Sequence, residues 1–358
     1  MTTAQAGTLA RSLVGRWEFV LVLLIVGAGI WGASLSPFFL DTQNLLDLMK
    51  PYTMIGLMAL GLTLVVVAGE IDISVASTLA VCVVVFADVW QHGVNIWLAC
   101  FIGLLVGTGL GLFNGVLVGV LHLPSLAVTL GTLAAYRGLA FVILGSEGIT
   151  GFPDGFTRLG NGYVASSSVP VGLAIFVAAA AVFGLLLHGT RFGRYVFAIG
   201  ANREAARFSG VPVDRVRVTL YAFSGLMAAA AGLLYASYFA TAQADAATVA
   251  LLDVVAAVVL GGVNIFGGSG TILGVFLAVV LIAVLRNAMG LANIAGDTQS
   301  IVIGGLLLGA ILVGNLLRGV REQGLGRRLA ERLERKEATS EKQPSGVPAT
   351  TGGNDERS

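Results

Sequence analysis

Residues 191–217 read RFGRYVFAIGANREAARFSGVPVDRVR, and this polar loop interrupts a series of apolar segments that are each long enough to cross a bilayer. Within the polar loop, Asn202 is a typical helix N-cap, and Gly210 and Pro212 are placed to end the helix that follows. The sequence therefore predicts one short helix over residues 203–209, about two turns and roughly 10 Å long, held at the membrane surface.

The predicted surface helix carries charge and one aromatic side chain. Arg203, Glu204 and Arg207 lie on it, and Phe208 lies near its end. Such side chains are suited to bind a soluble partner, so we predict a docking element and not a linker. The docking residues expected from the sequence are Asn202, Arg203, Glu204, Ala205, Ala206, Arg207, Phe208, Ser209 and Gly210.

The composition is that of a membrane protein. Hydrophobic residues make up 56% of the 358 residues and charged residues only 11%, which excludes a soluble domain with an ordinary charged surface. The net charge of +1 does not indicate nucleic-acid binding, because the basic residues are not clustered into one groove. Cys82 and Cys100 lie in or beside apolar segments, where we expect them to pack as small hydrophobic residues.

Ten apolar segments are long enough to cross the bilayer, which predicts an all-α polytopic bundle of about ten transmembrane helices. The expected membrane domain covers residues 19–318. Its coupling loop, expected at residues 189–217, contains the polar loop and the predicted docking helix. A cytoplasmic segment precedes the membrane domain at 1–18, and a partly disordered cytoplasmic tail follows at 319–358. The ten segments lie at about 19–36, 48–68, 73–89, 95–120, 126–145, 169–188, 216–238, 247–263, 271–289 and 298–316.

The basic residues indicate the orientation of the chain. Of the 21 lysines and arginines, two precede the first segment, six lie in the polar loop and nine follow the last segment. With ten crossings, all of these fall on one side, and the positive-inside rule identifies that side as the cytoplasm. Both termini and the polar loop are therefore predicted to be cytoplasmic. The opposite side receives only Lys50 and Arg158, while Arg137 and Arg286 lie within or near the ends of segments.

A first break, AGEIDIS at residues 68–74, separates two apolar segments and contains two carboxylates. Carboxylates at membrane depth are costly unless they face protein, water or a partner charge. Glu70, Asp72 and Ser74 are thus candidates for a translocation path or for organising a broken helix. The alternative is a tight cytoplasmic turn in which Asp72 only caps the next helix. The sequence leaves both alternatives open.

A second break, GGVNIFGGSG at residues 261–270, also separates two apolar segments. Its likeness to the first break is short, and it suggests an internal duplication. Interrupted helices in two parts of a transporter indicate the pathway, so Asn264 and Ser269 are further candidates for the translocation path. Glycine-rich turns also occur without any such role.

Five glycines recur every four residues along one apolar segment, which places them on one face of a helix. Such small residues allow close helix packing, or they allow a helix to shift during transport. Asn114 lies beside this strip and is expected either to bond a neighbouring helix or to face a cavity. The glycines are Gly103, Gly107, Gly111, Gly115 and Gly119.

The longest loop on the other side of the membrane covers residues 146–168 and contains Phe152, Phe156 and Tyr163. It is expected to be either a short lid folded against the outer mouth or a floppy turn. Two motifs are missing from the sequence: it contains no G-x-x-x-x-G-K-[ST] phosphate loop and no H-E-x-x-H zinc site. We therefore expect a non-catalytic chain without a bound cofactor, in which ATP is used by another subunit.

These residues resemble the membrane permease subunit of bacterial ATP-binding-cassette importers for simple sugars, the ribose, xylose and arabinose permease family. Within that family, ITGFPDGFTRLGN, SYFATAQAD and VLGGVNIFGGSGT are most similar to permeases for rhamnose or autoinducer-2. The stretches that carry the family resemblance are VVVAGEIDISVAS at 65–77, GLFNGVLVGVLHLPSLAVTLGTLAAYRGLA at 111–140, TRFGRYVFAIGANREAARFSGVPVDRVR at 190–217 and AAVVLGGVNIFGGSGTILG at 256–274.

The resemblance implies a multi-pass protein of the bacterial inner membrane that translocates a monosaccharide or a sugar-like molecule. It implies three partners: a periplasmic binding protein, a cytoplasmic ATPase, and a second permease chain that is either identical or different. The family's cytoplasmic coupling helix matches residues 202–210. Many relatives have glycine before isoleucine in the first break, and this chain has Glu70 instead.

Two other functions remain open from the sequence. One is an ion-coupled secondary transporter or channel, with Glu70, Asp72 or Asp253 as the coupling carboxylate. The polar loop argues against it, because an ion-driven carrier needs no surface docking helix. The other is a branched-chain amino-acid permease of the same importer superfamily, against which the Gly-Glu-Ile-Asp-Ile-Ser break favours sugars.

Overall fold

The structure is a computed structural model, and it describes residues 17–165 and 167–312. The described residues up to Leu308 form one compact unit, and the described residues from Gly309 to Leu312 belong to another. The predicted tail at 319–358 and most of the predicted segment at 1–18 lie outside the described residues. The elements in chain order are α2 Trp17–Leu35, α3 Thr42–Asp47, η1 Lys50–Tyr52, α4 Thr53–Val67, α5 Val75–Gln91, α6 Ile96–Gly119, α7 Ser125–Leu144, β1 Ile149–Thr150, α8 Asp154–Asn161, α9 Val171–Gly189, α10 Arg191–Ala201, α11 Arg203–Phe208, α12 Val213–Phe239, β2 Thr241–Ala242, α13 Ala250–Leu260, α14 Ile272–Leu291 and an unlabelled helix Gly296–Leu312.

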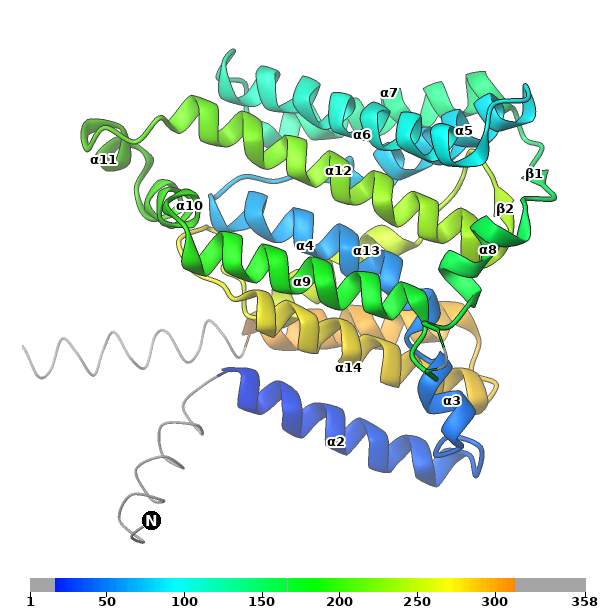
Figure 1. Cartoon of the computed structure of the whole chain (residues 1–358). Helices are drawn as coiled ribbons and strands as arrows, with labels where there is room; N and C mark the ends of the chain where they lie inside the picture. Colours follow the sequence, from blue (N-terminus) through cyan, green and yellow to red (C-terminus); the bar gives the residue numbers. More distant parts are fainter. Residues whose placement is uncertain (1–16, 166, 313–358) are drawn as a thin grey trace, which may run out of the picture. The chain divides into compact units, whose positions relative to one another are not determined.

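The predicted all-α polytopic bundle is confirmed. Among the described residues, seven helices are long and apolar enough to cross a membrane, and three shorter apolar helices, Val75–Gln91, Ala250–Leu260 and Gly296–Leu312, accompany them. These helices correspond one by one to the ten apolar segments of the sequence. Figure 1 shows that the long helices of the first unit run side by side, with α10 and α11 at one end and α8, β1 and β2 at the other.

Local sequence sets where the helices begin. Pro124, Pro153, Pro170 and Pro212 each stand directly before a helix, where the missing N–H and the fixed φ of proline favour helix initiation. Other helices begin with a side-chain cap, as in α6, where the Asn95 side chain accepts a hydrogen bond from the Trp97 N–H.

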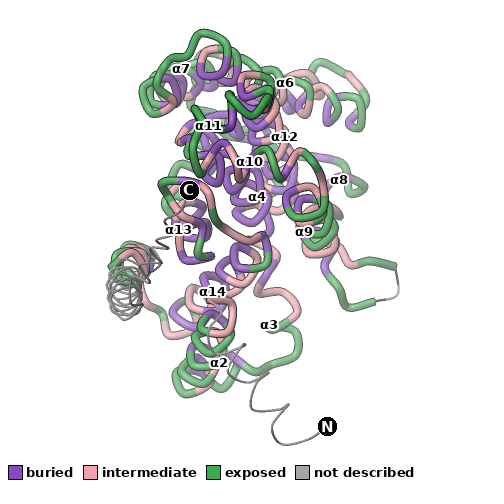
Figure 2. The backbone as a smooth tube through the Cα atoms, turned by 90° about the vertical axis from the view of Figure 1, so that its left-hand side faces the viewer, coloured by how far each residue is buried: buried purple, intermediate pink, exposed green. Residues whose placement is uncertain are grey.

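Helix α4 forms the centre of the bundle. Every residue of α4 except Met54 is buried, and Figure 2 shows this helix enclosed by its neighbours. In contrast, α7 and α9 expose large apolar side chains such as Val142 and Leu185. A helix that is apolar all round and buried belongs to the interior, whereas an exposed apolar face suits contact with lipid.

The glycine strip packs α6 against α12. A Cβ atom added at Gly111 would lie 2.2 Å from the Tyr221 carbonyl oxygen, and one added at Gly225 would lie 2.1 Å from the Gly107 carbonyl oxygen. Only residues without a side chain allow the two backbones to come this close. The close packing predicted for the strip is therefore confirmed.

The loop over residues 146–168 is folded against the bundle in its described part, as a lid would be. Ile149 pairs with Ala242 in a short antiparallel β1–β2 ladder, and the Ser237 hydroxyl accepts a hydrogen bond of 2.7 Å from the Gly160 N–H of α8. Phe152 and Phe156 are buried and pack against Phe86 with ring-centre distances of 5.3 and 4.9 Å. This aromatic cluster explains why the segment is ordered.

The polar loop contains two helices, so the expectation of a single helix was wrong. The additional helix is α10, which buries Gly193, Val196 and Ile199 on one face. These residues recur every three positions, which is the spacing of an amphipathic helix lying on the bundle. The side chain of Thr190 caps α10 by accepting a hydrogen bond from the Gly193 N–H.

Candidate functional site

Helix α11 has the termini that its sequence predicts. The Asn202 side chain accepts a hydrogen bond of 3.0 Å from the Ala205 N–H, which confirms Asn202 as the N-cap. Gly210 adopts a φ of +81°, a left-handed conformation that ends the helix at little cost only when the residue is glycine. The local chemistry of six residues and their caps thus fixes one short helix.

Helix α11 is almost fully exposed. Of residues 202–210, only Ala206 is buried, and the Phe208 side chain is 88% exposed. Two side chains nevertheless tie α11 to the bundle: Arg207 donates a hydrogen bond of 2.5 Å to Asp214 at the start of α12, and Arg203 donates one to Glu70 in the first break. Eight of the nine predicted docking residues therefore form one anchored, accessible surface, and Ala206 faces the protein.

Glu70 lies between two arginines. Its side chain is 3% exposed, and the Oε1 atom lies 2.8 Å from Nε of the buried Arg217 in α12 and also accepts the bond from Arg203. A buried carboxylate without a partner would be very costly, so this triad is what allows Glu70 to be buried. The sequence does not reveal the triad, because Arg203 and Glu70 are separated by 133 positions.

Asp72 and Ser74 are brought together with Asn114 in one buried network. Asp72 Oδ1 accepts hydrogen bonds from the Ser74 N–H (3.0 Å) and hydroxyl (2.6 Å), and Asp72 Oδ2 accepts one of 2.7 Å from Ser224 in α12. Asn114 Nδ2 donates to the Ser74 hydroxyl at 2.9 Å, and the Tyr136 hydroxyl donates to Asn114 Oδ1 at 3.2 Å. Asp72 thus joins the first break to α12, which goes beyond capping α5.

The backbone of the first break is also held by side chains. The Tyr221 hydroxyl donates to the Ile71 carbonyl at 2.9 Å, and the Ile71 N–H donates to the Ser125 hydroxyl at 3.2 Å. Residues 70–74 are not helical, so the neighbouring helices supply the hydrogen bonds that a helix would supply itself. The segment between α4 and α5 is consequently an interruption supported by protein groups.

The second break lies directly against the first. The Gly268 N–H donates a hydrogen bond of 2.8 Å to the Val67 carbonyl, and a Cβ atom added at Gly267 would lie 2.8 Å from the Gly69 Cα. The end of α10 joins them, since a Cβ atom at Gly200 would lie 1.9 Å from the Val67 carbonyl oxygen. Both breaks and the polar loop therefore meet at one end of the bundle.

Asn264 and Ser269 form bonds within the second break. The Asn264 N–H donates to the Ser269 carbonyl at 2.9 Å, and Asn264 Nδ2 donates to the Gly267 carbonyl at 2.7 Å. These bonds fix the conformation of the turn. A role of Asn264, Ser269, Glu70, Asp72, Ser74 and Asn114 in a translocation path stays a prediction.

Two arginines of apolar segments outside this site were not assigned partners from the sequence. Arg286 in α14 donates a hydrogen bond of 2.7 Å to Asp253 in α13, and both side chains are largely buried. Arg137 in α7 donates bonds of 2.7 and 3.0 Å to the carbonyls of Ala244 and Ala246. The sequence did indicate that such partners exist, because an arginine within an apolar segment must find hydrogen-bond acceptors inside the protein.

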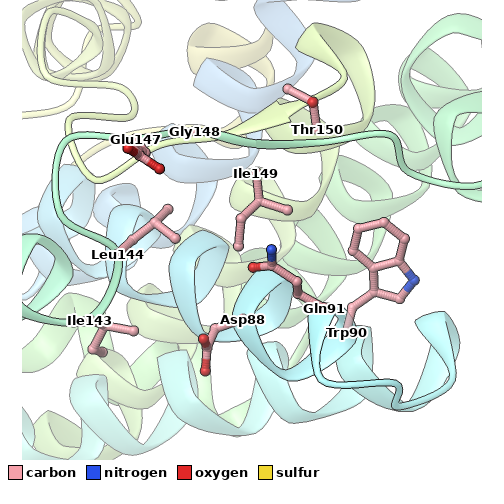
Figure 3. A pocket seen from close by; sticks show the side chains of 9 residues that line it. All are labelled: Asp88, Trp90, Gln91, Ile143, Leu144, Glu147, Gly148, Ile149 and Thr150. Carbon is pink, nitrogen blue, oxygen red and sulfur yellow. The ribbon is translucent and has the colours of Figure 1, made fainter.

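A cavity of about 660 Å³ lies at the opposite end of the bundle, between the ends of α5 and α7 and strand β1. Polar side chains among its lining residues are Asp88, Gln91, Glu147 and Thr150, and Trp90 borders it (Figure 3). It adjoins the folded loop over residues 146–168, so the two ends of the bundle differ in shape: tight glycine contacts between the two breaks at one end, and an open polar cavity at the other.

Comparison with known proteins gives consistent results. Residues 44–311 match the family described as "Branched-chain amino acid transport system / permease component". Proteins named autoinducer 2 import system permease protein LsrD are similar over most of their length. The protein from Klebsiella pneumoniae is 37% identical over 312 residues, which are 86% of this chain and 93% of that protein. The protein from Escherichia coli K12 is 38% identical over 313 residues, covering 86% and 94% of the two chains.

No solved structure matches this chain. The resemblance to importer permeases that the motifs indicate is confirmed by these relatives. Because the family match covers most of the chain and includes both breaks and α11, the chain belongs to this family of transport-system permease components.

Proposed function

We propose that this chain is the membrane permease subunit of an ATP-driven importer, and that its cargo is autoinducer 2 or a similar sugar-like molecule such as rhamnose. The similar proteins from Klebsiella pneumoniae and Escherichia coli, which are named as autoinducer 2 import permeases, support the cargo. The observation that carries the mechanism is α11, a capped helix that is exposed on its surface and anchored to the bundle by Arg203 and Arg207.

In this proposal, the cytoplasmic ATPase binds α11. ATP-driven closure of the ATPase displaces α11, and the bundle opens in response. The chain itself is non-catalytic and binds no cofactor, since ATP is bound and hydrolysed by the partner. A second permease chain, identical or different, completes the membrane core.

The basic residues support the orientation proposed for the bundle. Positive residues concentrate in the polar loop, so the end with α10 and α11 is cytoplasmic. Trp17 at the start of α2 donates a hydrogen bond of 2.7 Å to the Leu260 carbonyl next to the second break, which supports a cytoplasmic position for the N-terminal end of α2 as well. The end with α8, β1 and β2 then faces the periplasm of a bacterial inner membrane and receives cargo from a binding protein.

The two other functions have weaker support. In an ion-coupled carrier, a carboxylate has to be available for the ion, but Glu70 and Asp253 are paired with arginines and Asp72 accepts three hydrogen bonds. Branched-chain amino acids occur in the description of the family, so they remain the second candidate cargo.

The test combines purification and transport. The chain is extracted with its copurifying proteins, which are identified and reconstituted in liposomes. Uptake of labelled autoinducer 2, rhamnose and leucine is then compared with and without ATP, and with and without an ionophore. We expect copurification of an ATPase and ATP-dependent uptake of autoinducer 2 or rhamnose. Uptake that continues without ATP and stops with the ionophore would refute the proposal, and uptake of leucine alone would refute the cargo.

A further inference from the structure

The Glu70 triad connects the surface helix to the interior. Arg203 lies on α11 with 42% of its side chain exposed, whereas Glu70 and Arg217 are buried. Arg217 alone would neutralise the charge of Glu70, because one guanidinium next to one carboxylate already forms an ion pair. Arg203 therefore adds a connection that charge balance does not require, and it comes from the exposed helix.

On its other side, Glu70 is connected to the interior of the first break. The Glu70 N–H donates a hydrogen bond of 3.1 Å to the Val65 carbonyl at the end of α4. Two positions further on, Asp72 bonds Ser74 at the start of α5 and Ser224 in α12. A displacement of the Glu70 carboxylate therefore reaches α4 and the buried Asp72 network through short, hydrogen-bonded steps.

The surroundings of the first break limit other responses to such a displacement. Gly69 contacts the Gly267 backbone, and the Val67 carbonyl accepts the Gly268 N–H at 2.8 Å. These backbone contacts leave no flexible side chain to absorb a movement between α10 and the two breaks. Movement of α11 must therefore be passed on to the breaks or must break the ion pair with Arg203.

We propose that Glu70 is a positioning residue that transmits the displacement of α11 to the first break, and thereby sets how much cargo is moved for each ATP hydrolysed. This inference rests on the proposed function, because it requires an ATPase bound to α11.

The experiment measures the coupling ratio, which is the number of cargo molecules taken up per ATP hydrolysed, in liposomes containing the full complex. The probe is labelled autoinducer 2, with labelled rhamnose as a second probe. We expect Glu70→Gln and Arg203→Gln each to lower the ratio about tenfold while ATP hydrolysis continues, because each removes a charge-assisted hydrogen bond. The double variant should be no lower than either single variant, since both remove the same connection.

A matched control and a conservative variant complete the design. Arg215→Gln makes the same charge change at an exposed position of the polar loop and should keep the wild-type ratio. Glu70→Asp keeps the charge and should restore part of the ratio. Glu70→Gln leaves Arg217 buried without its carboxylate and can reduce the yield of complex, but the ratio is independent of yield, and Arg203→Gln tests the same pair from its exposed side.

The results separate this inference from the proposed function. If wild-type complex shows ATP-dependent uptake and both Glu70→Gln and Arg203→Gln keep the wild-type ratio, the role of Glu70 is refuted while the importer function stands. If wild-type complex shows no ATP-dependent uptake of either probe, the proposed function itself fails.

Discussion

Replacing Gly111 by alanine tests how much of the stability of the bundle depends on the contact between α6 and α12. The added methyl carbon would lie 2.2 Å from the Tyr221 carbonyl oxygen and 3.0 Å from the Gly225 Cα, whereas ordinary contacts begin at 3.4 Å. Both close neighbours are backbone atoms, so no side chain can rotate away. The two helices must separate by roughly 1 Å, and overpacking of this kind costs about 1–3 kcal/mol or more.

Gly109→Ala provides the matched control on the same helix. A Cβ atom at Gly109 has no neighbour within 4 Å, so this substitution only replaces glycine by a better helix former. It should stabilise the protein by up to about 1 kcal/mol. The two variants share the same chemical change and differ only in the face of α6 that receives the methyl group.

The assay is a titration of the purified protein in mixed micelles with increasing sodium dodecyl sulfate, followed by circular dichroism at the helix signal. We expect Gly111→Ala to unfold at lower detergent fraction than wild type, and Gly109→Ala to unfold at the same or a higher fraction. Equal curves for the two variants would refute the argument that the backbones of α6 and α12 are in contact at Gly111.

Two further predictions concern function and buried charge. Glu204→Arg and Ala205→Trp change exposed positions of α11, so both proteins should reach the membrane in normal amount but lose ATP-dependent uptake. Uptake is measured in membrane vesicles, and normal uptake by both variants would refute the coupling role of α11. Asp253→Asn leaves Arg286 buried without its carboxylate and should destabilise the protein by about 3–5 kcal/mol. The double replacement Asp253→Leu with Arg286→Met should recover most of this loss of stability. The detergent titration measures the stability of both variants, and equal stability of the single and double variants would contradict the pairing.

The local features of this chain could be predicted from the sequence because neighbouring residues determine them. Asn202 begins α11 because its side chain caps the first turn, and Gly210 ends α11 because it adopts a positive φ. The length of the apolar segments alone defines which segments can cross the bilayer. The glycine spacing in α6 likewise indicates a close contact, although it does not say which helix is the partner. Helix α10 had a signal, the spacing of Gly193, Val196 and Ile199, but its basic residues made it resemble an ordinary polar connection.

The pairing of buried charges could not be predicted. Glu70 finds Arg203 and Arg217, and Asp253 finds Arg286, only after the helices are packed. A carboxylate in an apolar region must find some partner, but that requirement is equally met by an arginine, a hydroxyl or a backbone N–H. Glu70 and Asp72 illustrate this, because they stand two positions apart and one is paired with guanidinium groups while the other accepts from hydroxyls and an amide.

Helix α12 is a continuous helix of 27 residues, about 40 Å long, and the glycine strip of α6 lies against it from Asp214 to Leu233. Its first turn is tied to α11 through Asp214, and its last turn is tied to α8 through Ser237. Because close backbone contacts hold α12 against α6 over this length, α12 cannot bend or tilt without moving α6 with it. A push on α11 at one end of α12 would therefore be carried along a stiff pair of helices to α8 at the other end.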